Sequence, residues 1–366
     1  MLRISRISRF LSIVVILLLA AGCAPDPVKP EPARQKLQLV WPEPPDLPRF
    51  KYETALRFKE DIAEQKSKLQ ELVEQGAPRK PAFDKPYAVV ARNGRIYVTD
   101  TKLRQVHVFD VPGRSFYRMG IRAPGTLVKP IGIALDGEMN VYVADATSKK
   151  IVVYDSLGLY VKDIGSSADL LHPSGVAVNT AGDRIYVIDT GGIDSAEHRV
   201  VVYDNEGKKL FAIGKRGTGD GEFNLPTVGA VAPDGTLYVL DAGNFRVQAF
   251  SPDGKFLRKW GRPGNEAGSF ARPRGIAVDQ EGRVYVTDPV FGNVQIFTPK
   301  GELLLAIGSQ GEEDTRGHYG LLSGVAVDET GRVYLLDQLY RKLEVIRPLS
   351  EEEGKAMVAA SRAENN

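Results

Sequence analysis

The sequence predicts an all-β fold, a six-bladed β-propeller of four-stranded antiparallel blades with a short helical insertion near the N-terminus. Two observations carry this prediction. A motif of the form aliphatic-Tyr-aliphatic-x-Asp recurs six times, at intervals of 44 to 52 residues. Between successive motifs lie short apolar runs bounded by Gly, Pro or Asp, which is typical of strands joined by tight turns. The motifs end at Asp100, Asp145, Asp189, Asp241, Asp288 and Asp337.

The fifth repeat, residues 273–308, shows the pattern of one blade. Its apolar runs lie at residues 275–278, 284–287, 294–297 and 303–307, and turn residues separate them. The first run of most repeats consists of small and branched residues, as in IGIAL, SGVAV and RGIAV. Because only small side chains fit where the blades of a propeller converge, the first run is predicted to be the innermost strand.

The two ends of the chain are predicted to close the ring. The sixth repeat has only three strands, and an uncovered strand edge would promote association. Residues 49–57 (RFKYETALR) are the expected fourth strand, so the propeller is predicted to span residues 49–349. Residues 58–76 have the apolar spacing of a helix and form the predicted insertion, while residues 350–366 form a polar tail.

The first 48 residues predict export and lipid anchoring. Residues 1–22 combine three arginines with an apolar run of eleven residues, which suits a signal peptide and is too short to span a bilayer. The run ends in Leu-Ala-Ala-Gly before Cys23, which resembles a bacterial lipobox and implies acylation of this cysteine. Eight prolines predict an extended spacer over residues 23–48. A plain secretory signal with an incidental cysteine is the alternative.

The predicted location is the bacterial cell envelope, with the membrane as a partner through lipidated Cys23. This residue is the only cysteine, so no disulfide can form within the chain. Ala24 follows it instead of the aspartate that retains many lipoproteins at the inner membrane. We therefore expect the outer membrane if the cell has one.

The charge balance argues against a nucleic-acid partner. The chain has 48 basic and 46 acidic side chains, but Arg3, Arg6 and Arg9 lie in the predicted signal peptide. Subtracting these three leaves 45 basic against 46 acidic side chains, a net charge of −1. A nucleic-acid-binding domain is usually strongly basic.

The repeats resemble the NHL family. The shared features are P-x-G-[IV]-A-V-D in the first strand, YV-x-D in the second, N-x-R-V-Q-x-F at residues 244–250 and the glycine-rich loop 214–223. The resemblance covers residues 86–349 and implies a six-bladed propeller. The Trp-Asp pair of WD40 repeats is absent, and Val stands where the YWTD propellers have Trp.

Candidate binding residues are expected on the face where the connections from fourth to first strand and from second to third strand emerge. The third strand begins five positions after the motif aspartate in five repeats but ten positions after it in the third, from Asp189 to Arg199. Loops on a rigid scaffold often carry function. The first-strand position after the proline should line the mouth of the channel. The candidates from both places are Tyr87, Ile131, Ser174, Thr227, Arg274, Ser323, Asp194, Glu197 and His198.

No cofactor and no metal are expected. Carboxylates can bind Ca²⁺ or transfer protons, but an aspartate present in every blade is better explained by hydrogen bonds to backbone amides. Related propellers, the peptidyl-hydroxyglycine lyases, place His directly after the first-strand proline, and no repeat here does so. The innermost strands also lack the charged ligand that a lactonase-like Ca²⁺ site would need, so the channel should be apolar and narrow.

The sequence therefore favours a lipid-anchored, extracytoplasmic propeller that acts as a scaffold binding a protein, peptide or glycan, without an enzymatic activity. The alternative is a metal-dependent propeller hydrolase or lyase of the lactonase-like kind. A bracing role within an envelope complex is a third possibility that the residues do not separate from the first.

Overall fold

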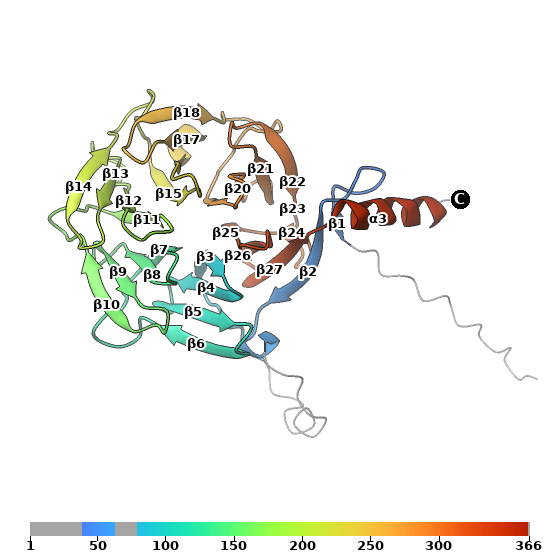
Figure 1. Cartoon of the computed structure of the whole chain (residues 1–366), viewed down its shortest axis with the longest axis horizontal. Helices are drawn as coiled ribbons and strands as arrows, with labels where there is room; N and C mark the ends of the chain where they lie inside the picture. Colours follow the sequence, from blue (N-terminus) through green and yellow to red (C-terminus); the bar gives the residue numbers. More distant parts are fainter. Residues whose placement is uncertain (1–38, 63–78, 365–366) are drawn as a thin grey trace, which may run out of the picture. The chain divides into compact units, whose positions relative to one another are not determined.

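A computed structural model describes residues 39–62 and 79–364, and these residues form six antiparallel sheets around a common axis (Figure 1). Residues Leu39–Asn366 are one compact unit. In blades 1 to 5 the first strand of the repeat is innermost and the fourth is outermost, as the sequence predicts; blade 6 has five strands, with a short additional strand at its outer edge. The predicted signal peptide, Cys23 and most of the proline-rich spacer lie outside the described residues.

Blades 1 to 3 follow each other directly along the chain. Blade 1 consists of β3 (Pro86–Arg92), β4 (Arg95–Asp100), β5 (Gln105–Asp110) and β6 (Ser115–Met119). Blade 2 consists of β7 (Pro130–Leu135), β8 (Val141–Asp145), β9 (Lys150–Tyr154) and β10 (Tyr160–Ile164). Blade 3 consists of β11 (Pro173–Val178), β12 (Ile185–Asp189), β13 (Arg199–Tyr203) and β14 (Lys209–Ile213).

Blades 4 and 5 repeat this order, and blade 6 takes its outer strand from the N-terminal side. Blade 4 consists of β15 (Pro226–Val231), β16 (Leu237–Asp241), β17 (Arg246–Phe250) and β18 (Phe256–Trp260), with the 3₁₀ turn η2 (Ala242–Asn244). Blade 5 consists of β19 (Gly275–Val278), β20 (Val284–Asp288), β21 (Asn293–Phe297) and β22 (Leu303–Ile307). Blade 6 consists of β25 (Leu322–Val327), β26 (Val333–Asp337), β27 (Lys342–Pro348), β2 (Phe50–Leu56) and the short β1 (Val40–Trp41).

The ring closes where β2 pairs antiparallel with β27. Phe50 lies opposite Pro348 and Leu56 opposite Leu343, with one register shift near Tyr52. This pairing agrees with the closing strand expected at residues 49–57, and it covers the edge that β27 would otherwise expose (Figure 1).

Three smaller features lie outside the blades. Of the helical insertion expected at residues 58–76, only the 3₁₀ turn η1 (Lys59–Ile62) falls within the described residues. The polar tail forms helix α3 (Glu351–Glu364), and a two-stranded parallel pair, β23 (Ser309–Gln310) and β24 (His318–Tyr319), precedes β25. Within the described ranges, no helix has the length and apolar character needed to cross a bilayer.

Glycines allow the innermost strands to approach one another around the axis. A Cβ atom placed on Gly132 would lie 2.7 Å from the Cα of Gly175, and one on Gly175 would lie 2.7 Å from the carbonyl oxygen of Thr227. Real Cβ atoms do not approach so closely, so a larger residue at either position would push neighbouring blades apart. The small residues of the first strand are therefore required by the convergence of the blades.

The hydrophobic core lies between adjacent blades. Strands β8, β12, β16, β20 and β26 are buried at every residue. Between blades 2 and 3, for example, Ile151, Val187 and Val201 belong to one cluster of buried side chains. Full burial of one such side chain contributes about 1.5–3 kcal/mol. Sheet-on-sheet packing repeated around the ring thus supplies a rigid platform for the loops at its ends.

Three of the six motif tyrosines close the turns between first and second strands. The hydroxyls of Tyr142, Tyr285 and Tyr334 each donate to an aspartate at the end of the neighbouring first strand, over 3.1, 3.0 and 2.8 Å. Burial first, and then the adjacent carboxylate, raise the pKa of each tyrosine, so the hydroxyls remain protonated donors. The acceptors are Asp136, Asp279 and Asp328.

Candidate functional site

The connections from second to third strand and from fourth to first strand share one end of the ring, which we call the loop face. Within the described residues it comprises 57–62, 79–85, 101–104, 120–129, 146–149, 165–172, 190–198, 214–225, 242–245, 261–274, 289–292, 308–321 and 338–341. All nine candidate binding residues lie on this face or at the adjoining mouth of the central channel.

The six motif aspartates lie beneath the loop face and bind its backbone. Asp145 is typical, because it accepts amide hydrogens from Val128 and Lys129 on one connection (2.6 and 3.1 Å) and from Thr147 and Ser148 on another (3.2 and 3.1 Å). All six carboxylates belong to residues that are fully buried. Their hydrogen-bonding capacity is used within the blade, so the geometry supports a structural role and not an acid–base or metal site.

The same aspartate has a different electrostatic environment in different blades. Burial opposes ionisation of Asp100, but hydrogen bonds from His107 and from several backbone amides outweigh it and lower the pKa of this carboxyl to about 2. Burial raises the pKa of Asp241, and hydrogen bonds from Asn244, the Asn224 amide and Arg246 oppose that rise without cancelling it.

Blade 4 holds its glycine-rich loop, residues 214–225, with side chains of β17. Arg246 donates to Asp241 over 2.8 Å and to the carbonyl oxygens of Thr218, Gly219 and Glu222, each over 2.8 Å. Gln248 also donates to the Glu222 carbonyl over 2.7 Å. The N-x-R-V-Q sequence thus ties the preceding loop to the second and third strands.

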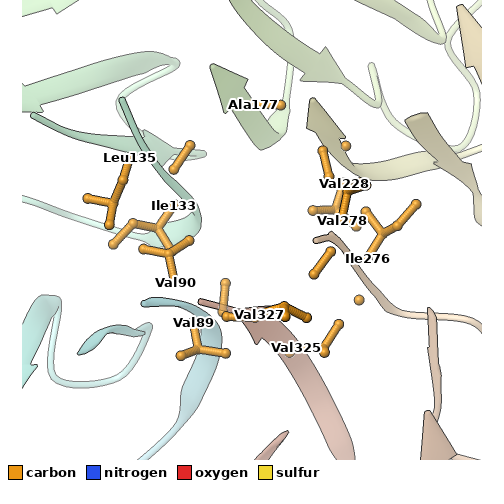
Figure 2. A pocket seen from close by; sticks show the side chains of 18 of the residues that line it. Val89, Val90, Ile133, Leu135, Ala177, Val228, Ile276, Val278, Val325 and Val327 are labelled. Carbon is orange, nitrogen blue, oxygen red and sulfur yellow. The ribbon is translucent and has the colours of Figure 1, made fainter. Parts of the chain in front are cut away.

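A cavity of about 190 Å³ runs along the axis of the propeller. Figure 2 shows its wall, in which aliphatic side chains from the innermost strands of all six blades surround the channel, as expected from the sequence. Polar residues line its two ends, Ser174, Arg274 and Ser323 toward the loop face and Arg92, Asp279 and Glu329 toward the opposite face. The channel therefore provides apolar contact area rather than a set of charged ligands along its middle section.

The channel mouth on the loop face is marked by one cation–π contact. The guanidinium carbon of Arg274 lies 4.9 Å from the ring centroid of Tyr87, although these residues belong to blades 5 and 1. Within the described ranges, no acidic side chain pairs with Arg274. Its N–H groups can therefore meet an anionic or carbonyl group of a ligand at the mouth.

The other four mouth candidates contribute less to an accessible surface. Ile131 and Ser323 are buried. The Ser174 hydroxyl donates to the Thr227 carbonyl oxygen over 2.9 Å and bonds the Thr190 hydroxyl over 2.6 Å. The Thr227 hydroxyl is buried without a partner among the described residues. Only Tyr87 and Arg274 are thus both distinctive and available.

The long connection of blade 3, residues 190–198, is held from inside by its histidine. The Nε2 atom of His198 lies 2.9 Å from the Gly192 carbonyl oxygen, and the Leu225 amide donates to Nδ1 over 3.0 Å. These two contacts assign the ring proton to Nε2, and His198 is fully buried. The expectation that His198 joins the binding rim is therefore wrong, because its ring is used to fix the loop.

The outer part of this connection remains exposed. Asp194 and Glu197 point to solvent, as does Ile193, which is 73% exposed. The Arg199 guanidinium pairs with Glu197 over 2.5 Å, and the Arg216 amide donates to the Ala196 carbonyl oxygen over 3.2 Å. The loop thus combines a fixed backbone with accessible acidic and apolar side chains.

The histidines do not converge on a metal site. Among residues 39–62 and 79–364, no three His, Cys, Asp or Glu side chains are arranged to hold a metal ion. His107 lies 3.5 Å from Asp100 and packs edge-on against Phe83. No sequence signal predicts the contact between His107 and Asp100, because the residue at the position of His107 differs in the other blades. None predicts the stacking of Arg274 on Tyr87, because these two residues are distant in the sequence.

Comparison with known proteins agrees with the fold. The chain is similar to a streptogramin B lyase (14% identity over 73% of this chain and 94% of that chain, TM-score 0.53). It is also similar to a protein from Xanthomonas campestris described as a gluconolactonase (18% identity, 81% and 98%, TM-score 0.55) and to hydrazine synthase of Kuenenia stuttgartiensis (16% identity, 75% and 98%, TM-score 0.51). At these identities the likeness concerns the fold alone.

These observations place the chain in the class of six-bladed β-propellers. More particularly, the family model for the NHL repeat matches residues 270–297, which span most of blade 5. The protein is therefore a six-bladed propeller with an NHL repeat.

Proposed function

We propose that the protein is a lipid-anchored scaffold of the bacterial cell envelope that binds a protein, peptide or glycan on its loop face. The lipobox-like sequence at Cys23 supports the anchor and the export. The single observation that carries the binding role is the connection at residues 190–198. It has nine residues where the other second-to-third connections have four, its backbone is fixed by buried His198, and its outer side chains are exposed.

The chemistry of the loop face supports binding over catalysis. The carboxylates repeated in every blade are buried and bonded to amides, as for Asp145. The middle of the channel wall is aliphatic, and among the described residues no group of three His, Cys, Asp or Glu side chains could hold a metal ion. Tyr87 and Arg274 present an aromatic surface and a cation at the mouth, and such residues are common at the centre of interfaces.

Exchange of the long loop tests this proposal. Residues 190–198 are replaced with the Ala-Gly-Asn-Phe connection of blade 4, residues 242–245, in the full chain. Crosslinking in native envelopes, followed by mass spectrometry, is expected to lose the partners that the wild type captures, while thermal unfolding changes little. Undiminished capture of the same partners would sink the proposal.

A matched control separates contact from loop geometry. The double substitution Asp194→Ala and Glu197→Ala keeps the length of the loop and His198, and it removes two exposed carboxylates together with the ion pair between Glu197 and Arg199. Partial loss of capture with this variant would show that the loop side chains contact the partner.

A metal-dependent hydrolase or lyase is the second candidate function. It is favoured by the position of Arg274, which lies at the mouth of a central cavity without an acidic partner in the described ranges and could bind an anionic substrate. The solved structures described as a streptogramin B lyase and a gluconolactonase share the fold. Hydrolysis of simple lactones by the purified protein, lost on Arg274→Ala and on metal chelation, would favour this candidate.

A further inference from the structure

The charges of the loop face are divided between two sectors. The connections at residues 101–104, 120–129, 146–149 and 338–341, from blades 6, 1 and 2, contain six Lys or Arg residues and no Asp or Glu. We call these four connections the basic sector. The connections at residues 165–172, 190–198 and 214–225 contain two Lys or Arg residues and five Asp or Glu. Between blades 6 and 1, residues 57–62 and 79–85 add five Lys or Arg and three Asp or Glu. A chain that is nearly neutral as a whole therefore presents an excess of cations on one side of this face.

Hydrogen bonds bring the loops of the basic sector together. The Asp84 carboxylate forms ion pairs with the Lys102 ammonium group (2.9 Å) and with the Arg341 guanidinium (3.6 Å). The connections of blades 1 and 6 therefore meet at one carboxylate. In blade 2, Asp145 accepts amides of Lys129 and Ser148, which fixes two further connections to each other. The buried motif aspartates thus hold the loop backbones, while Arg104 and Arg341 are exposed and Lys149 is half-buried.

Each blade of the basic sector places a cation at a left-handed backbone position. Arg104, Lys149 and Arg341 have φ values of 56°, 55° and 52°, and each lies directly before the third strand of its blade. Blade 5 has Gly292 at the corresponding place, with φ 63°. Glycine adopts this conformation without steric cost, whereas Arg and Lys do so rarely. The three cations are therefore not required by the turn itself.

Exposed aliphatic side chains accompany these cations. Leu339 and Leu103 are 60% and 41% exposed on the connections that carry Arg341 and Arg104. Ile121 and Val128 are exposed on the connection between blades 1 and 2, beside Arg122. These side chains stand at loop ends among charged neighbours.

We propose that the basic sector docks on an anionic lipid surface, independently of acylation at Cys23. Lys and Arg side chains near an anionic membrane are attracted to its headgroups, and interspersed aliphatic side chains can enter the boundary between headgroups and acyl chains. A protein interface is a poorer match for the three lysines, because Lys is depleted at such interfaces. A nucleic acid would use the cations but not the aliphatic loop ends.

Vesicle binding tests the proposal with residues 39–366, which contain the complete closed ring. The probes are vesicles of phosphatidylcholine alone and vesicles in which a third of the lipid is phosphatidylglycerol. The protein is expected to co-sediment with the anionic vesicles only. Binding should fall steeply between about 0.01 M and about 1 M salt, over which the Debye length shrinks from about 30 Å to about 3 Å. Equal binding to both kinds of vesicle, or none to either, would overturn the proposal.

The decisive variant is Arg104→Gly, Lys149→Gly and Arg341→Gly, because glycine fits all three backbone positions. Removing three cations at the membrane should weaken binding by about 100-fold. The matched control is Lys215→Gln, Arg262→Gln and Arg272→Gln, which removes the same charge from the loop face outside the basic sector. Equal weakening by both variants would mean that net charge alone drives binding and would overturn the assigned surface.

A third variant tests the aliphatic side chains. Leu103→Ser, Ile121→Ser and Leu339→Ser are expected to weaken binding at high salt more than at low salt, since they leave the cations in place. Heparin binding that depends on the three cations, without any vesicle binding, would assign the sector to a soluble polyanion and contradict the membrane proposal. Thermal unfolding of each variant checks that the ring is intact.

Discussion

Blades 3 and 4 hold the connection from second to third strand in place with different side chains. In blade 4 the connection is short, and Asp241 accepts hydrogen bonds from Asn244 and Arg246, both over 2.8 Å. In blade 3 the connection is long, and the buried ring of His198 joins the Gly192 carbonyl to the Leu225 amide. The first arrangement is a charged network beneath the loop, and the second is a single ring within it.

The difference suggests that the connection of blade 4 serves stability, whereas the connection of blade 3 offers side chains for recognition. The network of blade 4 is buried and consumes its polar groups, so it holds the scaffold and leaves little to offer a ligand. The loop of blade 3 fixes its backbone with one buried side chain and leaves Ile193, Asp194 and Glu197 exposed. Mutations in the two connections should therefore differ in their effects on stability and on binding.

The largest expected effect is that of Asp241→Ala. The substitution leaves Arg246, which is only 6% exposed, without its buried carboxylate, and it removes the acceptor for the Asn224 amide. Breaking one side of a buried charge pair costs about 3–5 kcal/mol in the free energy of unfolding. Urea denaturation measures this loss. Asp194→Ala, in the exposed loop of blade 3, serves as the control and should change stability by less than about 0.5 kcal/mol; similar losses in both variants would refute the distinction between the blades.

The corresponding aspartate of blade 1 sharpens the comparison through pH. The pKa of Asp100 is lowered to about 2, so its stabilising contribution is present above the unfolded pKa of about 4 and is lost as the pH falls toward 2. A difference of nearly two pKa units corresponds to about 2 kcal/mol. The free energy of unfolding should therefore fall by about this much more in the wild type than in Asp100→Asn between pH 4 and pH 2.

Asp241→Asn is the matched control for this pH dependence. Because the pKa of Asp241 is raised, its protonation on acidification does not remove stability in the same direction. Asp241→Asn should therefore not flatten the acid limb of the stability curve. An acid limb that is identical in the wild type and in Asp100→Asn would show that Asp100 gains nothing from its buried hydrogen bonds.

The smallest expected effect is that of His198→Ala. Two hydrogen bonds are lost, but water can reach the loop from outside, so the cost in global stability should be about 1 kcal/mol. Limited proteolysis should nevertheless cut within residues 190–198 faster than in the wild type, because the loop loses its internal contact. Unchanged cleavage would mean that His198 does not hold the loop.

Much of the fold can be predicted from the sequence because the same residue pattern recurs in every repeat. The period of the YV-x-D motif, the turn residues between runs and the small residues of the first strand each predict the blade, and their agreement predicts six of them. The glycines at 132 and 175 illustrate the reason, since their Cβ positions would collide with the next blade. A requirement imposed by the symmetry of the ring is repeated along the chain and is therefore visible in the sequence.

The candidate site was less predictable because its features occur once. The extra length of the connection at residues 190–198 is evident in the sequence, but the burial of His198 depends on Gly192 and Leu225, which come from two different loops. The helical insertion expected at residues 58–76 lies largely outside the described residues. The basic sector combines loops from blades 6, 1 and 2. Its positive charge is not evident from the net charge of the chain, because acidic residues elsewhere balance it.

The sequence by itself determined the number of blades, the order of strands within each blade and the structural character of the repeated aspartates. These features depend on local propensities and on a period that every blade must satisfy. Only the tertiary structure decided that Arg274 stacks on Tyr87, that His198 lies inside its loop and that six cations gather on one side of the loop face. Each of these depends on which loops the closed ring brings together, and that proximity has no period in the sequence.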